Sequence, residues 1–153
     1  MKFSGREDID ASHEFVWAQL ADFGAFERQA MRRGANVQRV DAGPVVQGSS
    51  WKVAFTYRGK ERRMKAVMTR LDPPNGLQLE TVSSGIDGIT QIDLVPLSPT
   101  RTRLAMSIDL SAKSLTARLM LQSLKLAKAN LSNRFKTRLR DFAQEVEARH
   151  RRS

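Results

Sequence analysis

A long run of alternating apolar and polar residues ends near residue 110, where a helical period replaces it, and this change limits the folds open to the chain. Between residues 36 and 110, apolar and polar side chains alternate, as in Trp51-Lys52-Val53-Ala54-Phe55, which is typical of half-buried strands. Short turn sequences such as Asp72-Pro73-Pro74-Asn75-Gly76 favour antiparallel hairpins, because parallel crossovers need a dozen or more residues. Residues 114–149 contain neither glycine nor proline, which predicts one long helix.

Two short helices are predicted ahead of the alternating region. Residues 2–11 have the pattern of a modest strand, and Ser12 follows as a helix N-cap with Glu14 in the first turn. A second short helix is predicted over residues 22–33, with Gly34 as its stop. The order is therefore a strand, two short helices, a run of strands and a long helix.

This order predicts an α+β fold in which one antiparallel sheet of about seven strands covers its apolar face with the C-terminal helix. A chain of 153 residues, 41% hydrophobic and 27% charged, has enough apolar surface for one packed domain and little room for a second. We expect that domain over residues 1–148. The basic residues 149–153 are expected to fray.

Cysteine and histidine usage excludes several kinds of chemistry. The absence of cysteine removes disulfides, thiolate metal sites and a cysteine nucleophile. His13 and His150 are the only imidazoles and stand at opposite ends of the sequence, so no multi-histidine metal site is expected. We expect neither a metal nor a cofactor.

The predicted long helix has two apolar stripes and a basic face between them. Its main stripe consists of Met120, Leu124, Ala127, Leu131, Phe135, Leu139, Phe142 and Val146. Leu115, Leu119 and Leu126 form the second stripe, in the N-terminal half. The basic face carries Arg118, Lys125, Lys128, Lys136 and Arg140.

Charge is concentrated in this last segment. The net charge is +10, yet residues 1–110 hold 15 basic and 13 acidic side chains, against 11 basic and three acidic in residues 111–153. Such a face is either solvated or meets an anionic partner. No base-reading element accompanies it, and Arg32-Arg33 and Arg62-Arg63 add charge without a motif, so no specific nucleic-acid binding is expected.

The element order resembles the helix-grip fold of the START-like superfamily, also called SRPBCC, which includes polyketide cyclase-like proteins. The most specific match is Ile9-Asp10-Ala11-Ser12-His13-Glu14-Phe15-Val16-Trp17, followed by Leu20 and Asp22. Asp72-Pro73-Pro74 before an apolar strand is also similar to the family pattern. The resemblance covers nearly the whole chain, and these motifs are structural rather than catalytic.

The resemblance implies that the sheet is curved and wraps around the C-terminal helix. It also implies an elongated apolar cavity between sheet and helix, for a hydrophobic or amphiphilic small molecule such as a lipid, polyketide or quinone-like compound. Binding, transport or sensing of such a ligand is the expected function. The residues expected to line the cavity are Trp51, Phe55, Tyr57, Met64, Met68, Leu79, Thr81, Thr90, Ile92, Met106, Leu124 and Leu131. The alternative is that these side chains simply fill a core.

The cavity mouth can be placed by counting strand reversals. The turns at 59–60, 84–88 and 111–114 are expected at one end of the sheet. That end carries Arg58, Lys60 and Lys113, which could bind an acidic head group at the rim. The alternative is that these cations are solvated hairpin charges.

A polyketide cyclase or dehydratase-like enzyme is the alternative function. General acid–base catalysis needs a side chain within reach of the substrate, and Tyr57 is the candidate. No paired carboxylate is recognised: Asp93 and Asp109 are expected on the outer face of the sheet, and His13 at the start of the first helix.

The second leucine stripe has three interpretations. Leu115, Leu119 and Leu126 could pack against the core or cavity, form a homodimer contact, or insert shallowly into an anionic membrane beside the basic face. A peripheral membrane-surface accessory protein is thus a third reading of the function. No apolar run approaches the roughly 20 residues that span a bilayer, and the first residues lack a signal peptide's apolar segment, so a cytoplasmic protein is expected.

Overall fold

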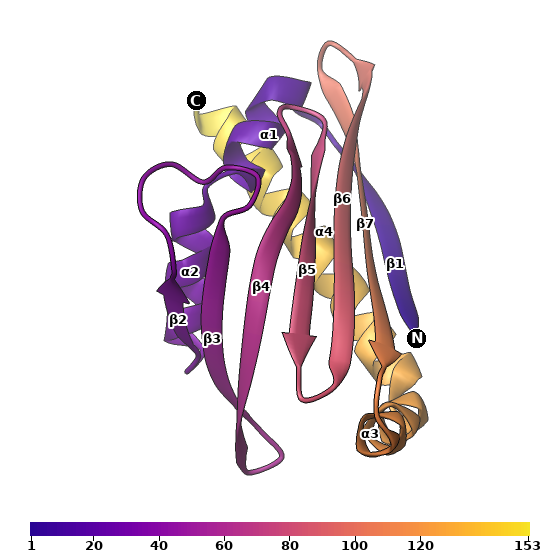
Figure 1. Cartoon of the computed structure of the whole chain (residues 1–153). Helices are drawn as coiled ribbons and strands as arrows, with labels where there is room; N and C mark the ends of the chain where they lie inside the picture. Colours follow the sequence, from indigo (N-terminus) through magenta and orange to yellow (C-terminus); the bar gives the residue numbers. More distant parts are fainter.

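The computed structural model describes residues 1–153 and contains one sheet with four helices (Figure 1). The strands are β1 (Lys2–Ile9), β2 (Asn36–Arg39), β3 (Ser50–Tyr57), β4 (Lys60–Asp72), β5 (Gly76–Ser83), β6 (Ile86–Ser98) and β7 (Arg101–Ala112). The helices are α1 (His13–Leu20), α2 (Phe23–Arg32), α3 (Leu115–Leu126) and α4 (Lys128–Arg152).

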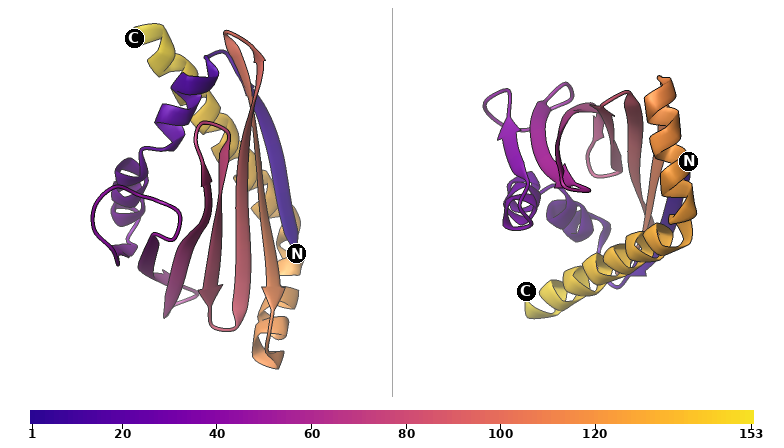
Figure 2. Two further views of the ribbon diagram at one scale, coloured as in Figure 1. Left: turned by 45° about the horizontal axis from the view of Figure 1, so that its top comes forward. Right: turned by 90° about the horizontal axis from the view of Figure 1, so that it is seen from below.

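All seven strands form a single antiparallel sheet in the order β1-β7-β6-β5-β4-β3-β2. Hairpins connect β3 through β7 in sequence, and β1 closes the sheet on the far side of β7. The sheet curls, and α4 crosses its concave side diagonally (Figure 2). The predicted α+β helix-grip architecture is confirmed, including the two short helices after the first strand.

Both short helices begin at a side-chain cap, Ser12 as the sequence predicts and Asp22, which was expected as the first helical residue. Ser12 Oγ accepts a hydrogen bond from the Phe15 N–H at 3.2 Å, and Asp22 Oδ1 accepts one from the Ala25 N–H at 3.2 Å. The chain leaves α2 through Gly34, whose φ of +94° lies in the region that glycine adopts without steric cost.

The C-terminal segment is two helices rather than the one long helix that was expected. Ala127 breaks the helix at φ −104° and ψ 12°, and its N–H donates to the Leu124 carbonyl at 3.0 Å, a tighter turn than the α-helical one. The bend lets α3 cover the end of β7 while α4 runs along β1 (Figure 1). Helix propensity did not predict this break, because no glycine or proline marks Ala127. The two helices pack against different strands of the curled sheet.

The tail expected to fray, residues 149–153, continues α4 for all but its last residue. α4 continues to Arg152, and Arg149 donates to Gln19 Oε1 at 2.8 Å and pairs with Glu145. These contacts tie the last turns of α4 to α1.

The core lies between the sheet, α1 and the C-terminal half of α4. Its fully buried side chains include Ile9, Val16, Met68, Leu104 and Val146. These side chains fill the space between the sheet and the helices at the end where α1 packs, whereas α3 lies at the opposite end.

Candidate ligand-binding groove

An open apolar groove lies between the concave face of the sheet, α3 and the first half of α4. Its volume is about 520 Å³, and 11 of its 17 lining residues are hydrophobic. The sheet contributes Phe55 and Met64, α3 contributes Met120 and Leu124, and α4 contributes Leu131. Mostly apolar walls with few polar groups are typical of small-molecule sites.

Six of the twelve residues predicted to line a cavity line this groove. They are Phe55, Tyr57, Met64, Thr81, Leu124 and Leu131.

The other six lie elsewhere on the same side of the sheet. Trp51, Met68 and Ile92 are buried in the core, and Leu79 and Met106 are partly buried against it. Thr90 is half-buried between Leu79 and Ile108 in the strand register, and it is not among the groove residues. Trp51, Met68 and Ile92 belong to one buried cluster with residues of α1 and α4.

The three cations predicted at the mouth lie at the expected end of the sheet, although none lines the groove. Arg58 donates to Ser123 Oγ of α3 at 2.8 Å. Lys113 pairs with Asp87 at 2.8 Å, and this hydrogen bond raises the pKa of the lysine. Lys60 is exposed at the hairpin. Two of the three therefore already have partners in the protein.

Arg62 is a groove residue that the sequence reading missed. The register pairs it with Phe55, so its side chain lies on the concave face, two residues before Met64. The guanidinium lies over the Tyr57 ring, with Cζ 5.7 Å from the ring centroid. Counting back from Met64 by two would have found this residue, whereas reading Arg62-Arg63 as one charge pair concealed it.

The groove has arginines but no carboxylate. Arg134 and Arg138 of α4 line it together with Arg62, and its remaining polar residues are Tyr57, Thr81, Ser83 and Ser84. None of the three arginines lies within ion-pair distance of an acidic group. The groove is therefore apolar and electropositive.

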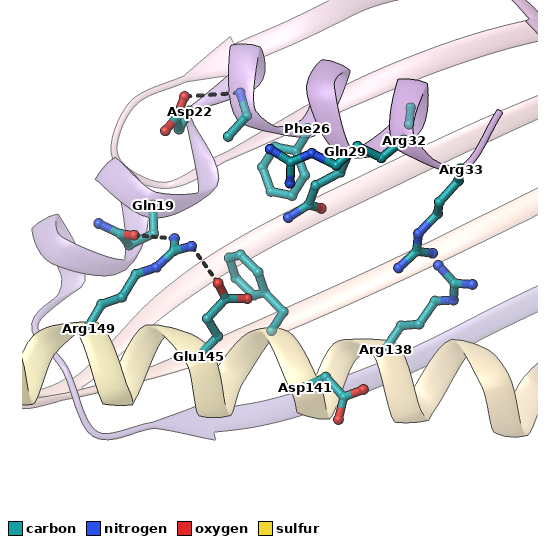
Figure 3. Close-up of a pocket in the computed structure, with 13 residues that line it drawn as sticks. Gln19, Asp22, Phe26, Gln29, Arg32, Arg33, Arg138, Asp141, Glu145 and Arg149 are labelled. Atoms are coloured by element: carbon teal, nitrogen blue, oxygen red, sulfur yellow. Dashed lines mark hydrogen bonds and ion pairs between the residues drawn. The ribbon is translucent and has the colours of Figure 1, made fainter. Parts of the chain in front are cut away.

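A second cleft, of about 620 Å³, lies between α2 and α4 (Figure 3). Only four of its 13 lining residues are hydrophobic, and both signs of charge are present. Asp22 caps α2, and Arg149 is held by Gln19 and Glu145. The first groove is the better ligand site, despite its smaller volume, because burying an apolar molecule needs apolar walls.

The acid–base candidates other than Tyr57 lie away from the groove. Asp93 pairs with Arg70 at 2.9 Å, and Asp109 is exposed, as expected. His13 stands at the opposite end of the molecule, beside the loop after Pro96, with its Nε2 buried and without a hydrogen-bond partner. No group of three or more His, Cys, Asp or Glu side chains is placed to hold a metal ion.

The second leucine stripe is on the surface, so its core or cavity reading is wrong. The exposed fractions are 74% for Leu115, 59% for Leu119 and 92% for Leu126. α3 instead buries Ala117 and Leu121. No helix is long and apolar enough to cross a membrane.

The fold and the groove together define a helix-grip protein with an apolar, ligand-sized space beside its C-terminal helices. The chain belongs to the family described as polyketide cyclase / dehydrase and lipid transport, whose model matches residues 1–147. The expected resemblance to polyketide cyclase-like proteins is thereby confirmed.

Solved structures share this fold at low sequence identity. The ZhuI aromatase/cyclase from Streptomyces sp. R1128 aligns with a TM-score of 0.67 and 16% identity over 97% of this chain and 94% of its own. Truncated norcoclaurine synthase from Thalictrum flavum aligns with a TM-score of 0.66 and 14% identity, over 95% and 92% of the two chains. A START superfamily protein from Mycobacterium smegmatis aligns with a TM-score of 0.56 and 15% identity, over 87% and 95%. No curated protein matches the sequence.

Proposed function

We propose that this protein binds a hydrophobic or amphiphilic small molecule, such as a lipid or a polyketide, in the groove between its sheet and α3–α4. The observation that carries this proposal is the apolar wall, to which Phe55, Met64, Leu124 and Leu131 contribute beside a filled core. Methionine and leucine side chains adapt to ligands of varied shape, which suits a carrier or sensor. Membership of a family that includes lipid transport supports the same function.

The test is binding of a neutral apolar dye, Nile red, together with native mass spectrometry of protein purified from its own host. Leu124→Trp fills the groove, and we expect it to weaken dye binding by about tenfold. Leu115→Trp places the same ring on an exposed position of α3 and should leave dye binding unchanged. Equal binding by both variants, with no co-purified ligand, would contradict the proposal.

Catalysis of the cyclase or dehydratase kind is the alternative, and Tyr57 is the side chain that it would require. The ring lines the groove, and its hydroxyl is the weak acid available there. The groove walls hold no carboxylate or imidazole to act with it, so binding is the better-supported function. Turnover of a polyketide substrate that is lost in Tyr57→Phe would favour the enzyme.

A second candidate function is peripheral contact of α3 with an anionic membrane. The exposed Leu115, Leu119 and Leu126 stand beside Arg118 and Lys125, and no acidic residue occurs between Asp109 and Asp141. Apolar side chains next to cations are what an anionic bilayer surface binds. This contact would also bring the groove close to a source of amphiphiles.

Vesicle co-sedimentation tests the membrane contact. The wild-type protein should sediment with vesicles containing phosphatidylserine and stay free of neutral phosphatidylcholine vesicles. Leu119→Ser with Leu126→Ser should lose this binding, and Leu97→Ser, an exposed leucine on β6, is the matched control. A dimer that these α3 substitutions dissociate, without vesicle binding, would assign the stripe to a homodimer instead. Cell fractionation would test the expected cytoplasmic location.

A further inference from the structure

We propose that the groove selects amphiphiles with an anionic head group, a carboxylate or a phosphate, and that Arg62, Arg134 and Arg138 bind that head group. This inference rests on the proposed ligand-binding function and names the chemical class of the ligand. It moves the anion site from the hairpin rim, where Arg58, Lys60 and Lys113 lie, into the wall of the groove itself.

Charge balance is the first argument. The groove wall carries three guanidinium groups and no carboxylate, although the chain has 16 acidic residues. Arginine is charged at every physiological pH, so these groups cannot relieve their repulsion by losing protons. Arg62 is half-buried beside the apolar wall, where less water screens its attraction for an anion than at the exposed Arg134 and Arg138.

Arg62 is the best positioned of the three. Its Nε donates to the Tyr57 carbonyl at 3.5 Å and its Nη1 approaches Met120 Sδ at 3.9 Å, both of which are weak contacts. The Nη2 group has no partner in the protein. The Tyr57 ring holds the guanidinium plane through a cation–π contact at 5.7 Å. The side chain is thus half-buried and oriented, with donors still free to bind an oxyanion.

Arg138 connects this groove to the outer cleft between α2 and α4, since it lines both. Figure 3 shows the side chains of Arg33 and Arg138 extending toward one another across that cleft. Asp141 also lines the cleft, but in Figure 3 its carboxylate points away from these two side chains, and it forms no ion pair with either arginine. Two facing like charges destabilise the empty site, and an anion between or beside them would offset that cost.

Chain-matched probes separate the head group from the tail. Binding of dodecanoate, dodecyl phosphate and dodecanol to the full chain is measured by calorimetry at low and high salt. We expect at least one anionic probe to bind about tenfold more tightly than the alcohol, an advantage that shrinks as salt rises. Comparing the two anions shows whether a carboxylate or a phosphate head group is preferred.

Charge-neutral variants locate the site. Arg62→Gln, Arg134→Gln and Arg138→Gln should each reduce the advantage of the anion while leaving dodecanol binding unchanged. Arg140→Gln is the control, because Arg140 is on the same helix and faces Glu7 at 3.9 Å outside the groove. Thermal unfolding of each variant, followed by circular dichroism, checks that it folds.

The outcomes distinguish this inference from the proposed function. If dodecanol and both anions bind equally, or the anion's advantage survives in all three glutamine variants, the anion site is overturned and the apolar groove stands. If no probe binds, the proposed function fails as well. If Arg140→Gln reduces the advantage of the anion as much as the three groove variants do, the effect is one of net charge. That result would also overturn the site.

Discussion

The Arg62 guanidinium lies over the face of the Tyr57 ring, with 5.7 Å between the guanidinium carbon and the ring centroid, on the wall of the apolar groove. The same ring also carries the guanidinium of Arg58 at 5.3 Å. One aromatic side chain therefore orients two cations, one inside the groove and one at its rim. This arrangement holds charge beside an apolar wall without a carboxylate partner.

The Tyr57 ring, rather than its hydroxyl, should matter for binding. Tyr57→Phe keeps the aromatic face, so the affinity for dodecanoate should change by less than about twofold. Tyr57→Leu removes both cation–π contacts, each worth about 0.5–1 kcal/mol, and should weaken dodecanoate binding severalfold. Isothermal titration calorimetry of the two variants tests this prediction. A large loss in Tyr57→Phe would instead assign a direct role to the hydroxyl.

A close approach of α4 to β1 should make Gly5 intolerant of larger residues. A Cβ atom at Gly5 would stand 3.2 Å from Leu139 Cδ2 and 3.4 Å from the Phe135 ring. Gly5→Val should lower the free energy of unfolding in urea by about 1–3 kcal/mol, because the helix has to move or Leu139 has to leave its rotamer. Leu139→Ala removes a buried side chain, yet it should cost less stability in the Gly5→Val background than in the wild-type chain, since it vacates the contested space. Strict additivity of the two substitutions would contradict this account.

Acid should destabilise the protein through Asp41. This carboxylate accepts hydrogen bonds from Arg39 Nη2 at 2.7 Å, the Ser50 N–H at 3.0 Å and Ser49 Oγ at 2.9 Å. These bonds, that from Arg39 foremost, hold the pKa of Asp41 well below its usual range. The pKa of Asp8 is lowered in the same way, mainly by its hydrogen bond from Arg103.

A depressed pKa in the folded state adds stability above the unfolded pKa of about 3.9, and this stability is lost as the pH falls toward the folded value. The urea midpoint should therefore be level near neutral pH and decline below about pH 4. Asp41→Asn should lower the midpoint at pH 7 and flatten the acid limb. Glu80→Gln, on the exposed side of β5, is the control and should leave the acid limb intact. An unaltered acid limb in Asp41→Asn would contradict the assignment.

The Thr102 hydroxyl should contribute to stability through one buried hydrogen bond. The side chain is fully buried, and its Oγ1 donates to the Ala11 carbonyl at 2.9 Å, which joins β7 to the turn before α1. Thr102→Val leaves that carbonyl without this donor and should reduce the free energy of unfolding by about 1–3 kcal/mol. Thr102→Ser keeps the hydroxyl and should lose less. Equal losses in both variants would show that the methyl group, not the hydrogen bond, is what matters.

Local pattern was enough to predict the elements and their order. Alternation from Trp51 onward and the short turns led to the antiparallel sheet, and the glycine-free C-terminal segment led to a helical end of the chain. The predicted cap Ser12 begins α1. Counting strand reversals also brought the turns after β3, β5 and β7 to one end of the sheet, as Figure 1 shows. These predictions succeeded because the spacing of apolar residues in strands and helices, and the residue types that turns require, depend only on a few neighbouring residues.

The candidate site was only half predictable. Period two indicates which side of a strand faces inward, but it does not distinguish Met68, buried in the core, from Met64, on the groove wall. That difference depends on where α1 and α4 cover the sheet, and these segments are distant in sequence. Arg62 was missed for a related reason. Its charge suggested an exposed side chain, although its place in the alternation puts it on the same face as Met64.

The sequence by itself determined that a basic C-terminal segment would follow an antiparallel sheet, because composition and period are properties of the chain alone. Only the tertiary structure decided what that segment does: the bend at Ala127, the exposure of Leu126 and the position of Arg134 and Arg138 on the groove wall. The physical reason is that a helix carries side chains around its whole circumference, so its sequence alone does not fix which of them will be buried. Which side becomes core, surface or binding wall depends on the curvature of a sheet assembled from residues far away in the chain.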